Sequence, residues 1–206
     1  MADIKLIGVA ASRTFRNIWM LEELGATYSH DPIHYTDPAL KTPPYLAINP
    51  NAKLPMAVVD GMPIFESLAI NLYLAEKFGG ALSPTNAEER GLVAQWTLWA
   101  ATAVEDDLGK WAYHTMFLPE AERDPKLAAD CLARVQTPLA VLDGVLAKQA
   151  FLVGNRFTVA DLNVACVCYR LLAMELADKP NLKRWLHAAW ARPAALTARR
   201  ARGDKV

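Results

Sequence analysis

The chain has 206 residues, is 53% hydrophobic, and balances 22 Lys and Arg residues with 22 Asp and Glu residues. This apolar content supports a packed core and excludes a disordered chain, because disordered segments are poor in apolar residues. The balanced charge argues against a nucleic-acid partner, and no apolar run reaches the roughly 18 residues of a membrane span. With no secretory signal at the N-terminus, we expect a cytoplasmic protein without nucleic acid or membrane among its partners.

The cysteines predict free thiols rather than a disulfide framework. Cys131, Cys166 and Cys168 are an odd number, which is typical of a reducing compartment. On a helix the side chains of Cys166 and Cys168 diverge, so we expect buried structural thiols and no zinc site. The four histidines also lack a metal-ligand spacing, so no metal is expected.

The first 80 residues alternate between strand-like and helix-like patterns in the order β-α-β-α-β-β-α. Two strands separated by a helix, followed by a hairpin that turns at Asp60-Gly61, predict a thioredoxin-like α/β domain over residues 1–80. The strands are expected at 4–9, 28–35, 56–59 and 63–65, the helices at 15–24 and 66–78, and an irregular stretch with four prolines at 37–50.

From residue 87 to 206 the pattern predicts an all-α C-terminal domain. Asn86 and Glu89 resemble a capping pair that starts this domain. Near its end, the run Arg199-Arg200-Ala201-Arg202 is expected to be a solvated tail, because charged residues at a terminus usually face water. The helices are expected at 87–116, 125–148, 158–176 and 180–190.

Two neighbouring motifs carry the first chemical signal. Pro55 stands directly before a predicted strand, which makes Leu54–Pro55 a candidate cis bond. Such a turn exposes the backbone of Leu54, whose N–H and C=O can pair with an extended peptide. Glu66 and Ser67 begin a helix, where a carboxylate, a hydroxyl and free amides can hold a ligand with an ammonium and a carboxylate. The same two residues can also simply cap the helix.

These motifs resemble, in order and spacing, the glutathione S-transferase superfamily. The matching segments are Asn49-Pro50, Lys53-Leu54-Pro55 and Glu66-Ser67-Leu68-Ala69-Ile70, and the second half adds a capping box of Thr158 and Asp161. The likeness covers about residues 4–195. It implies the glutathione S-transferase fold, an α/β thioredoxin-like N-terminal domain followed by an all-α C-terminal helical domain. It also implies glutathione as co-substrate, a homodimer and a role in detoxification.

Within this superfamily the thiol-activating residue follows the first strand. Here that place reads Ala10-Ala11-Ser12-Arg13-Thr14-Phe15-Arg16, without tyrosine or cysteine. The Ser-x-x-x-Arg pattern resembles the serine-type, theta- or zeta-like and bacterial-style members. The resemblance implies that Ser12 donates a hydrogen bond to the glutathione sulfur and so favours the thiolate. Thr14 is the alternative donor, and Ser12 also suits the N-cap of the first helix. The Ser-Ser-Cys start of maleylacetoacetate isomerases is absent.

The resemblance further implies a glutathione S-transferase that activates the glutathione thiol for attack on a small hydrophobic electrophile, or a glutathione-dependent isomerase or reductase. A non-catalytic ligand- or partner-binding protein of the same fold is the other hypothesis. An aromatic cluster near the end of the helix at 87–116 is expected either to line the electrophile pocket or to belong to the core. The implied glutathione-binding residues are Lys41, Lys53, Leu54, Pro55, Glu66 and Ser67, and the pocket candidates are Trp111, Tyr113, His114 and Phe117.

Overall fold

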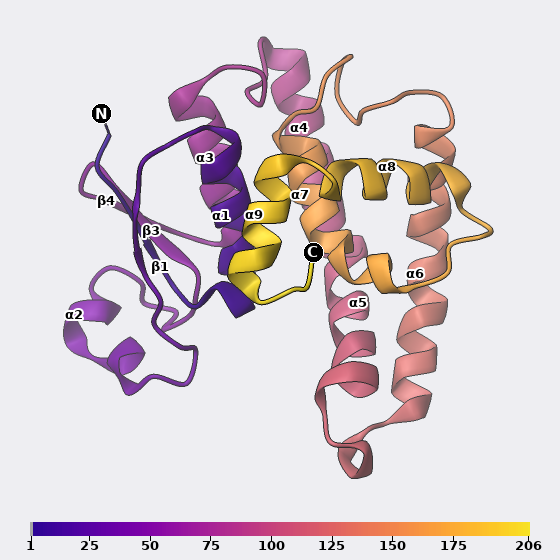
Figure 1. The fold of residues 1–206 in the computed structure, drawn as a ribbon, viewed down its shortest axis with the longest axis horizontal. Coiled ribbons are helices and arrows are strands. Elements are labelled where there is room, and N and C mark those ends of the chain that lie inside the picture. The colour runs from indigo at the N-terminus through magenta and orange to yellow at the C-terminus, as the bar shows by residue number, and fades with distance from the viewer. Residues whose placement is uncertain (1) are drawn as a thin grey trace. The chain divides into compact units, whose positions relative to one another are not determined.

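The computed structural model describes residues 2–206, which form two compact units. One unit runs from the N-terminus to Ser83 and also includes Ala191–Val206, and the other is Pro84–Trp190. Figure 1 shows the strands in the first part of the chain and the long helices in the second. The expected domains, 1–80 and 87–206, differ from these units in where they assign Ala191–Val206.

The first unit contains a four-stranded sheet in the order β2-β1-β3-β4. β1 pairs with β2 in parallel and with β3 in antiparallel orientation, and β3 and β4 form a hairpin. The predicted topology is therefore confirmed. The hairpin turns at Asp60 and Gly61, whose φ angles of 50° and 80° are those of a two-residue turn. The strands are β1 (Ile4–Ile7), β2 (Ser29–Asp31), β3 (Met56–Val59) and β4 (Met62–Phe65).

β2 is shorter than the predicted strand at 28–35. Pro32 follows its last residue and has no N–H to donate to the ladder, so regular pairing ends there. The chain still stays beside the end of β1, because Val9 N–H donates to Ile33 O over 2.8 Å. This contact holds the segment that follows β1 and leads to Ser12.

Three helices pack in the first unit, and two short turns of helix occupy the proline-rich stretch. α1 connects β1 to β2 and contacts α3 and α9. α9 lies beside α1 although the two are far apart in sequence (Figure 1). The helices are α1 (Phe15–Glu23), α3 (Ser67–Phe78) and α9 (Pro193–Arg202), and the short ones are η2 (Pro38–Lys41) and α2 (Pro43–Leu46).

The solvated tail expected for the C-terminal arginines is wrong for Arg199 and Arg202, whereas Arg200 is exposed. Arg202 Nη1 donates to the carbonyl of Ala11 over 2.8 Å, and its guanidinium lies 4.9 Å from the ring centroid of Phe15. Arg199 pairs with Asp204 at 3.0 Å. Ala195 and Ala198 are buried, and such small side chains let α9 approach α1 closely. The helix is thus anchored rather than solvated.

The second unit is helical, as predicted, but the helices predicted at 87–116 and 158–176 are each divided. The helix expected at 87–116 breaks at Val104, after which Glu105, Asp106 and Asp107 begin a new helix. Acidic residues are favoured in a first turn, which explains the restart. The helices are α4 (Ala87–Ala103), α5 (Glu105–Ala112), α6 (Pro125–Leu146), α7 (Val159–Val167) and α8 (Pro180–Trp190), with η3 (Tyr113–Phe117), η4 (Glu120–Glu122) and η5 (Cys168–Ala173) between them.

α7 is the buried centre of this unit, and Asp161 organises its start. The predicted capping box of Thr158 and Asp161 is confirmed. The Asp161 carboxylate also accepts from Leu152 N–H at 2.9 Å and from Trp185 Nε1 at 3.0 Å. Burial raises the pKa of this carboxyl, and the donated hydrogen bonds oppose that rise. The predicted cap of α4 is confirmed as well, with Glu89 N–H donating to Asn86 over 2.8 Å.

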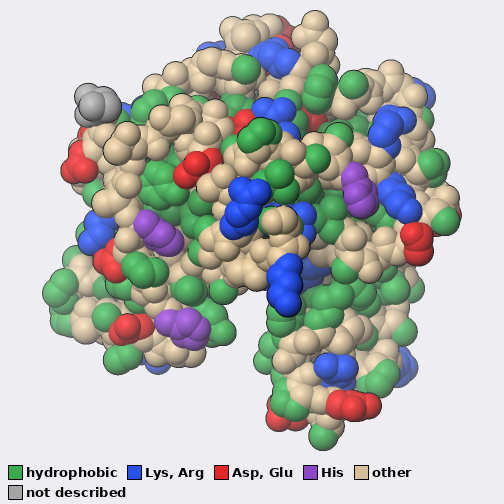
Figure 2. Space-filling model, viewed as in Figure 1, with side chains coloured by type: hydrophobic (Ala, Val, Ile, Leu, Met, Phe, Trp, Pro, Cys, Tyr) green, Lys and Arg blue, Asp and Glu red, His purple; other side chains and the backbone are tan. Residues whose placement is uncertain are grey.

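The distribution of surface charges and the burial of the cysteines agree with the expectations from composition. On the face drawn in Figure 2, acidic and basic side chains are spread among apolar and uncharged ones. Cys131, Cys166 and Cys168 are buried thiols that take part in no disulfide, as predicted. Among residues 2–206, no helix combines the length and apolarity needed to cross a bilayer, and no cluster of three potential metal-binding side chains occurs.

Candidate active site

Ser12 lies in η1 (Ala10–Thr14), directly before α1, and its backbone breaks the helical path with φ −90° and ψ −169°. Its hydroxyl donates to Val9 O over 2.7 Å and lies 2.8 Å from Thr14 Oγ1. It also accepts from Thr14 N–H at 3.2 Å, a contact like that of a helix cap. Ser12 is half-buried, whereas Thr14 is completely buried. Of the two hydroxyls, that of Ser12 is the one open to a ligand.

Gly8 allows this loop to approach the segment that contains Leu54. Its φ of 131° lies in the region that favours glycine. A Cβ at this position would lie 2.3 Å from Thr14 Oγ1 and 3.3 Å from Leu54 Cβ. Both neighbours therefore pack against a bare α-carbon. The result is that the Ser12 loop and Leu54 are adjacent.

The Leu54–Pro55 peptide bond is cis, as the sequence predicts. The preceding carbonyl, that of Lys53, accepts from Tyr45 Oη and from Asn49 Nδ2, each over 2.8 Å. These two bonds anchor the segment before the cis bond. Within residues 2–206, the backbone N–H and C=O of Leu54 take part in no hydrogen bond. They are available to an added extended peptide.

Glu66 and Ser67 stand at the start of α3, in different environments. Glu66 is exposed, has a φ of 71°, and its side chain makes no capping hydrogen bond, so its carboxylate is not used as a cap. Ser67 is buried, and its hydroxyl accepts from Arg16 Nη1 of α1 at 3.3 Å. A buried guanidinium therefore reaches the first residue of α3. The positive end of the α3 dipole and Arg16 together favour an anion there.

Two buried asparagines that the sequence analysis did not single out hold this arrangement. Asn17 Nδ2 donates to Ser67 O at 2.8 Å and to Asn71 Oδ1 at 2.7 Å. Asn71 Nδ2 in turn donates to Arg16 O at 3.4 Å. The network fixes α1 to the beginning of α3. In the sequence this network is visible only as one amide residue on each of two helices, among largely apolar neighbours.

The two predicted lysines are both exposed and near the same segment of chain. Lys41 ends η2, and Lys53 directly precedes Leu54. Neither ammonium group forms an ion pair with the described residues. Each is therefore able to meet a carboxylate of a ligand.

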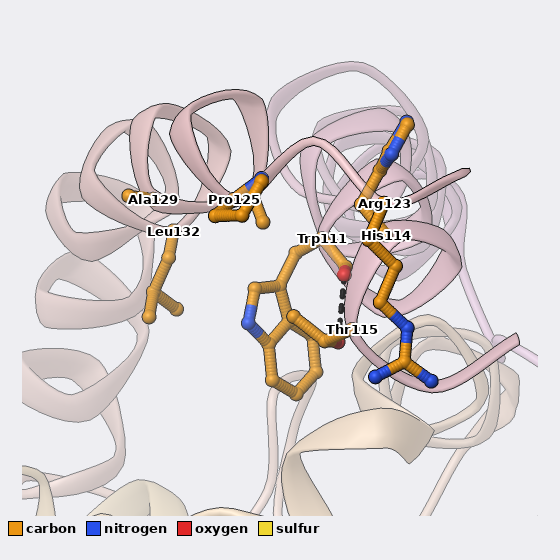
Figure 3. Close-up of a pocket in the computed structure, with 8 residues that line it drawn as sticks. Trp111, His114, Thr115, Arg123, Pro125, Ala129 and Leu132 are labelled. Atoms are coloured by element: carbon orange, nitrogen blue, oxygen red, sulfur yellow. Dashed lines mark hydrogen bonds between the residues drawn. The ribbon is translucent and has the colours of Figure 1, made fainter. Parts of the chain in front are cut away.

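The aromatic candidates divide into two pairs. Trp111 and His114 line a cavity of about 320 Å³ between the end of α5 and the start of α6 (Figure 3). Tyr113 and Phe117 are exposed and do not line it. Phe117 instead lies under the guanidinium of Arg170, 5.6 Å from its ring centroid. The other residues that line the cavity are Thr115, Arg123, Pro125, Ala128, Ala129 and Leu132.

The residues of the first unit therefore assemble three functions. Ser12 offers a hydroxyl donor at the start of a helix, Leu54 offers an unpaired backbone edge, and Ser67 offers a hydroxyl next to a buried positive charge. Gly8 joins the first two, and Arg16 joins α1 to the third. Such a set can hold a short peptide with an anionic end and stabilise an anion near Ser12.

Two family models and several known proteins match this chain. Residues 3–76 match the family model described as "Glutathione S-transferase, N-terminal domain", and residues 105–193 match its C-terminal domain. The chain is 32% identical to "Glutathione S-transferase 3" of Zea mays, over 94% of this chain and 92% of that one. A theta class glutathione S-transferase from Xanthomonas axonopodis pv. citri, solved with glutathione bound, superposes with a TM-score of 0.88 at 29% identity, covering 100% of this chain and 99% of that one.

A further relative carries a different name. "Elongation factor 1-gamma 2" of Oryza sativa subsp. japonica is 32% identical over 151 residues. This match covers 70% of this chain and 36% of the relative, so it concerns only part of that longer protein.

Proposed function

The chain belongs to the glutathione S-transferase family, and on this basis we propose that it activates the thiol of glutathione for attack on a small hydrophobic electrophile. The observation that carries the proposal is the half-buried Ser12 hydroxyl beside Leu54, whose backbone groups are unpaired. A tripeptide thiol requires a hydroxyl that donates to its sulfur and, next to it, backbone groups that pair with its peptide.

Ser12 donates its hydrogen bond to the glutathione sulfur when its hydroxyl rotates away from Val9 O. Thr14 then stabilises this orientation of the Ser12 hydroxyl, because the Thr14 N–H and hydroxyl can both donate to Ser12 Oγ. The N-terminus of α1 adds positive potential, and both effects favour thiolate over thiol. The thiol proton leaves to solvent, and the thiolate forms the new S–C bond as the electrophile's leaving group departs. Thr14 is too buried to contact the sulfur itself.

Glutathione is held at three points. The Leu54 backbone pairs with the peptide, as the cis Leu54–Pro55 turn suits. The Glu66 carboxylate takes the γ-glutamyl ammonium, and the Ser67 hydroxyl, backed by Arg16, takes the γ-glutamyl carboxylate. Lys53 meets the glycyl carboxylate, with Lys41 as the alternative.

We expect Ser67→Ala and Lys53→Ala each to weaken glutathione binding by about tenfold or more. A hydrogen bond to a charged group contributes roughly 1.5–3 kcal/mol, and about 1.4 kcal/mol corresponds to one decade in affinity. Isothermal titration calorimetry measures the effect, with thermal melts to verify that both variants fold. Lys41→Ala is the comparison: a larger loss there than in Lys53→Ala would assign the glycyl end to Lys41. Unchanged affinity in all three variants would overturn this placement.

We expect Arg202→Met to lower turnover by up to about tenfold, because Arg202 positions the Ser12 loop through the carbonyl of Ala11. Arg202 does not contact glutathione in this proposal, so glutathione affinity should change little. The matched control is Arg200→Met, which removes the same charge from an exposed position on the same helix. The measurement is kcat together with the titration of the bound thiol. Equal behaviour of the two variants would contradict a positioning role.

The electrophile site is proposed at the cavity lined by Trp111 and His114. Its volume of about 320 Å³ suits a small ligand. Tyr113 and Phe117 lie outside this cavity and are not part of the proposed site.

A second candidate function is a non-catalytic binding domain, favoured by the similarity to part of an elongation factor 1-gamma. Retention on glutathione-agarose followed by a panel of electrophiles distinguishes the two. Retention with turnover supports the transferase, and analysis of the products separates conjugation from isomerisation or reduction. Retention without turnover on the whole panel would favour the binding protein.

We also propose a cytoplasmic homodimer that acts in detoxification. The family supports the dimer and the role, and three buried cysteines outside any disulfide suit a reducing compartment. Light scattering coupled to size-exclusion chromatography tests the dimer, and a mass of one chain would overturn it.

A further inference from the structure

Arg123 is the basic group of the cavity between α5 and α6, and its position is fixed at one end. Its Nε donates to Leu118 O over 2.9 Å. Its two terminal nitrogens form no hydrogen bond or ion pair with residues 2–206. The side chain is half-buried and lines the cavity. A guanidinium held by Nε alone presents its remaining donors in a planar fork, which matches a carboxylate.

His114 supplies a second donor to the same cavity. Its Nδ1 accepts a hydrogen bond from the backbone N–H of Asp124 over 3.1 Å. A neutral imidazole that accepts at Nδ1 carries its proton on Nε2, which is then a donor. The Thr115 hydroxyl is already used, since it donates to Trp111 O over 2.7 Å (Figure 3).

The rest of the lining is apolar. Trp111 forms one wall, and in the view of Figure 3 its indole lies between the α6 side chains Ala129 and Leu132 and the Arg123 side chain. An aromatic ring or a branched alkyl group fits such a surface.

No carboxylate lines the cavity within the described residues. Between η3 and α6 the acidic residues are Glu120 and Glu122 of η4 and Asp124. The Asp124 carboxylate caps α6 by accepting from Leu127 N–H at 2.9 Å, and the two glutamates are exposed outside the lining. The charge presented inside the cavity is therefore positive.

From this combination we propose that the electrophile carries a carboxylate on an aromatic or branched apolar body. The carboxylate pairs with the Arg123 fork, His114 Nε2 donates a further hydrogen bond, and the apolar body packs against Trp111 and Leu132. This inference rests on the transferase function proposed above and specifies its substrate class. A benzylic halide with a ring carboxylate has this chemistry: the thiolate forms the S–C bond, and halide leaves with the electron pair of the broken carbon–halogen bond.

The first test compares 4-(chloromethyl)benzoate with its neutral methyl ester as electrophiles. The wild-type kcat/KM is expected to favour the acid by about tenfold. Arg123→Met should abolish that preference, so that the acid and the ester react with similar kcat/KM. Lys126→Met is the matched control, because Lys126 lies close in sequence, is 85% exposed and pairs with Asp130 instead of lining the cavity. An acid-to-ester ratio in Arg123→Met equal to that of the wild type would overturn the inference.

The second test measures binding without glutathione or turnover. Calorimetry with 2-naphthoate and 2-naphthalenemethanol is expected to show binding of the anion only, lost in Arg123→Met and kept in Lys126→Met. If naphthoate binds in this way but no electrophile reacts, the cavity assignment stands and the transferase function fails. If electrophiles react and Arg123→Met changes neither naphthoate affinity nor the acid preference, the transferase function stands and this inference fails.

Discussion

Replacing Ser12 by alanine is expected to lower turnover at neutral pH by about one to two decades while glutathione affinity stays close to that of the wild type. The loss arises because the bound sulfur keeps its proton when its hydrogen-bond donor is removed, so less thiolate is present. We expect affinity to be preserved because, in the proposed binding mode, Leu54, Glu66 and Ser67 hold the peptide. Ultraviolet absorbance of the bound thiolate against pH reports the thiol pKa directly, and it should rise in Ser12→Ala.

Thr14→Ala is the companion variant for this experiment. Thr14 supports Ser12 through two contacts but is itself buried, so we expect a smaller rise in the thiol pKa. A shift seen only in Thr14→Ala would make Thr14 the donor and Ser12 a helix cap. A thiol pKa unchanged in both variants would leave the backbone amides and the α1 terminus as the activating groups. Ser12→Cys adds a further readout, since a thiol there can form a mixed disulfide with glutathione.

Asp161→Ala is expected to have the largest effect on stability, a loss of about 3–5 kcal/mol in the free energy of unfolding. The variant leaves four buried donors without this acceptor, namely the N–H groups of Leu152 and Thr158, the Thr158 hydroxyl and the Trp185 indole. Each unsatisfied buried donor costs roughly 1–3 kcal/mol. The reciprocal half of the capping box is lost, whereas Thr158 keeps its own bond from Ala160 N–H.

Urea unfolding followed by circular dichroism measures this loss. The control is Asp130→Ala, which removes a carboxylate whose side chain is 49% exposed and pairs with Lys126. Exposed pairs of this kind contribute about 0–1 kcal/mol, so the control should unfold close to the wild-type midpoint. Similar midpoints for the two variants would show that the Asp161 network does not stabilise the second unit.

Features with local signals were predictable from the sequence. The succession of strands and helices along the chain, the turn at Asp60 and Gly61, and the caps at Asn86 and Thr158 all have signals in residues a few positions apart. The cis Leu54–Pro55 bond was predictable because proline is the residue that tolerates it. The position of Ser12 after the first strand was also predictable, because it depends only on the order of residues along the chain.

Features that depend on distant parts of the chain were not predictable. In the sequence, Arg202 is only a charged residue near a terminus. Its acceptor Ala11 lies 191 positions away, and the contact becomes visible only when α9 is seen to pack against α1. The hydrogen bond from Arg16 to Ser67 spans 51 positions, and no local pattern encodes it. The break at Val104 was hidden by an apolar pattern that continues through it, and Arg123 acquires meaning only once its loop lies beside Trp111.

The packing of α9 against α1 also has a consequence for how the protein is made. The first unit is discontinuous, because Ala191–Val206 are translated after the whole of Pro84–Trp190. Domains generally form during synthesis in the order in which they leave the ribosome. The stretch Pro84–Trp190 can therefore fold while the β-sheet upstream still lacks one of its helices. The Ser12 loop acquires its contact with Arg202 only after α9 has emerged from the exit tunnel. Nascent chains stalled before that point would hold a folded helical unit and a Ser12 loop without its contact to Arg202.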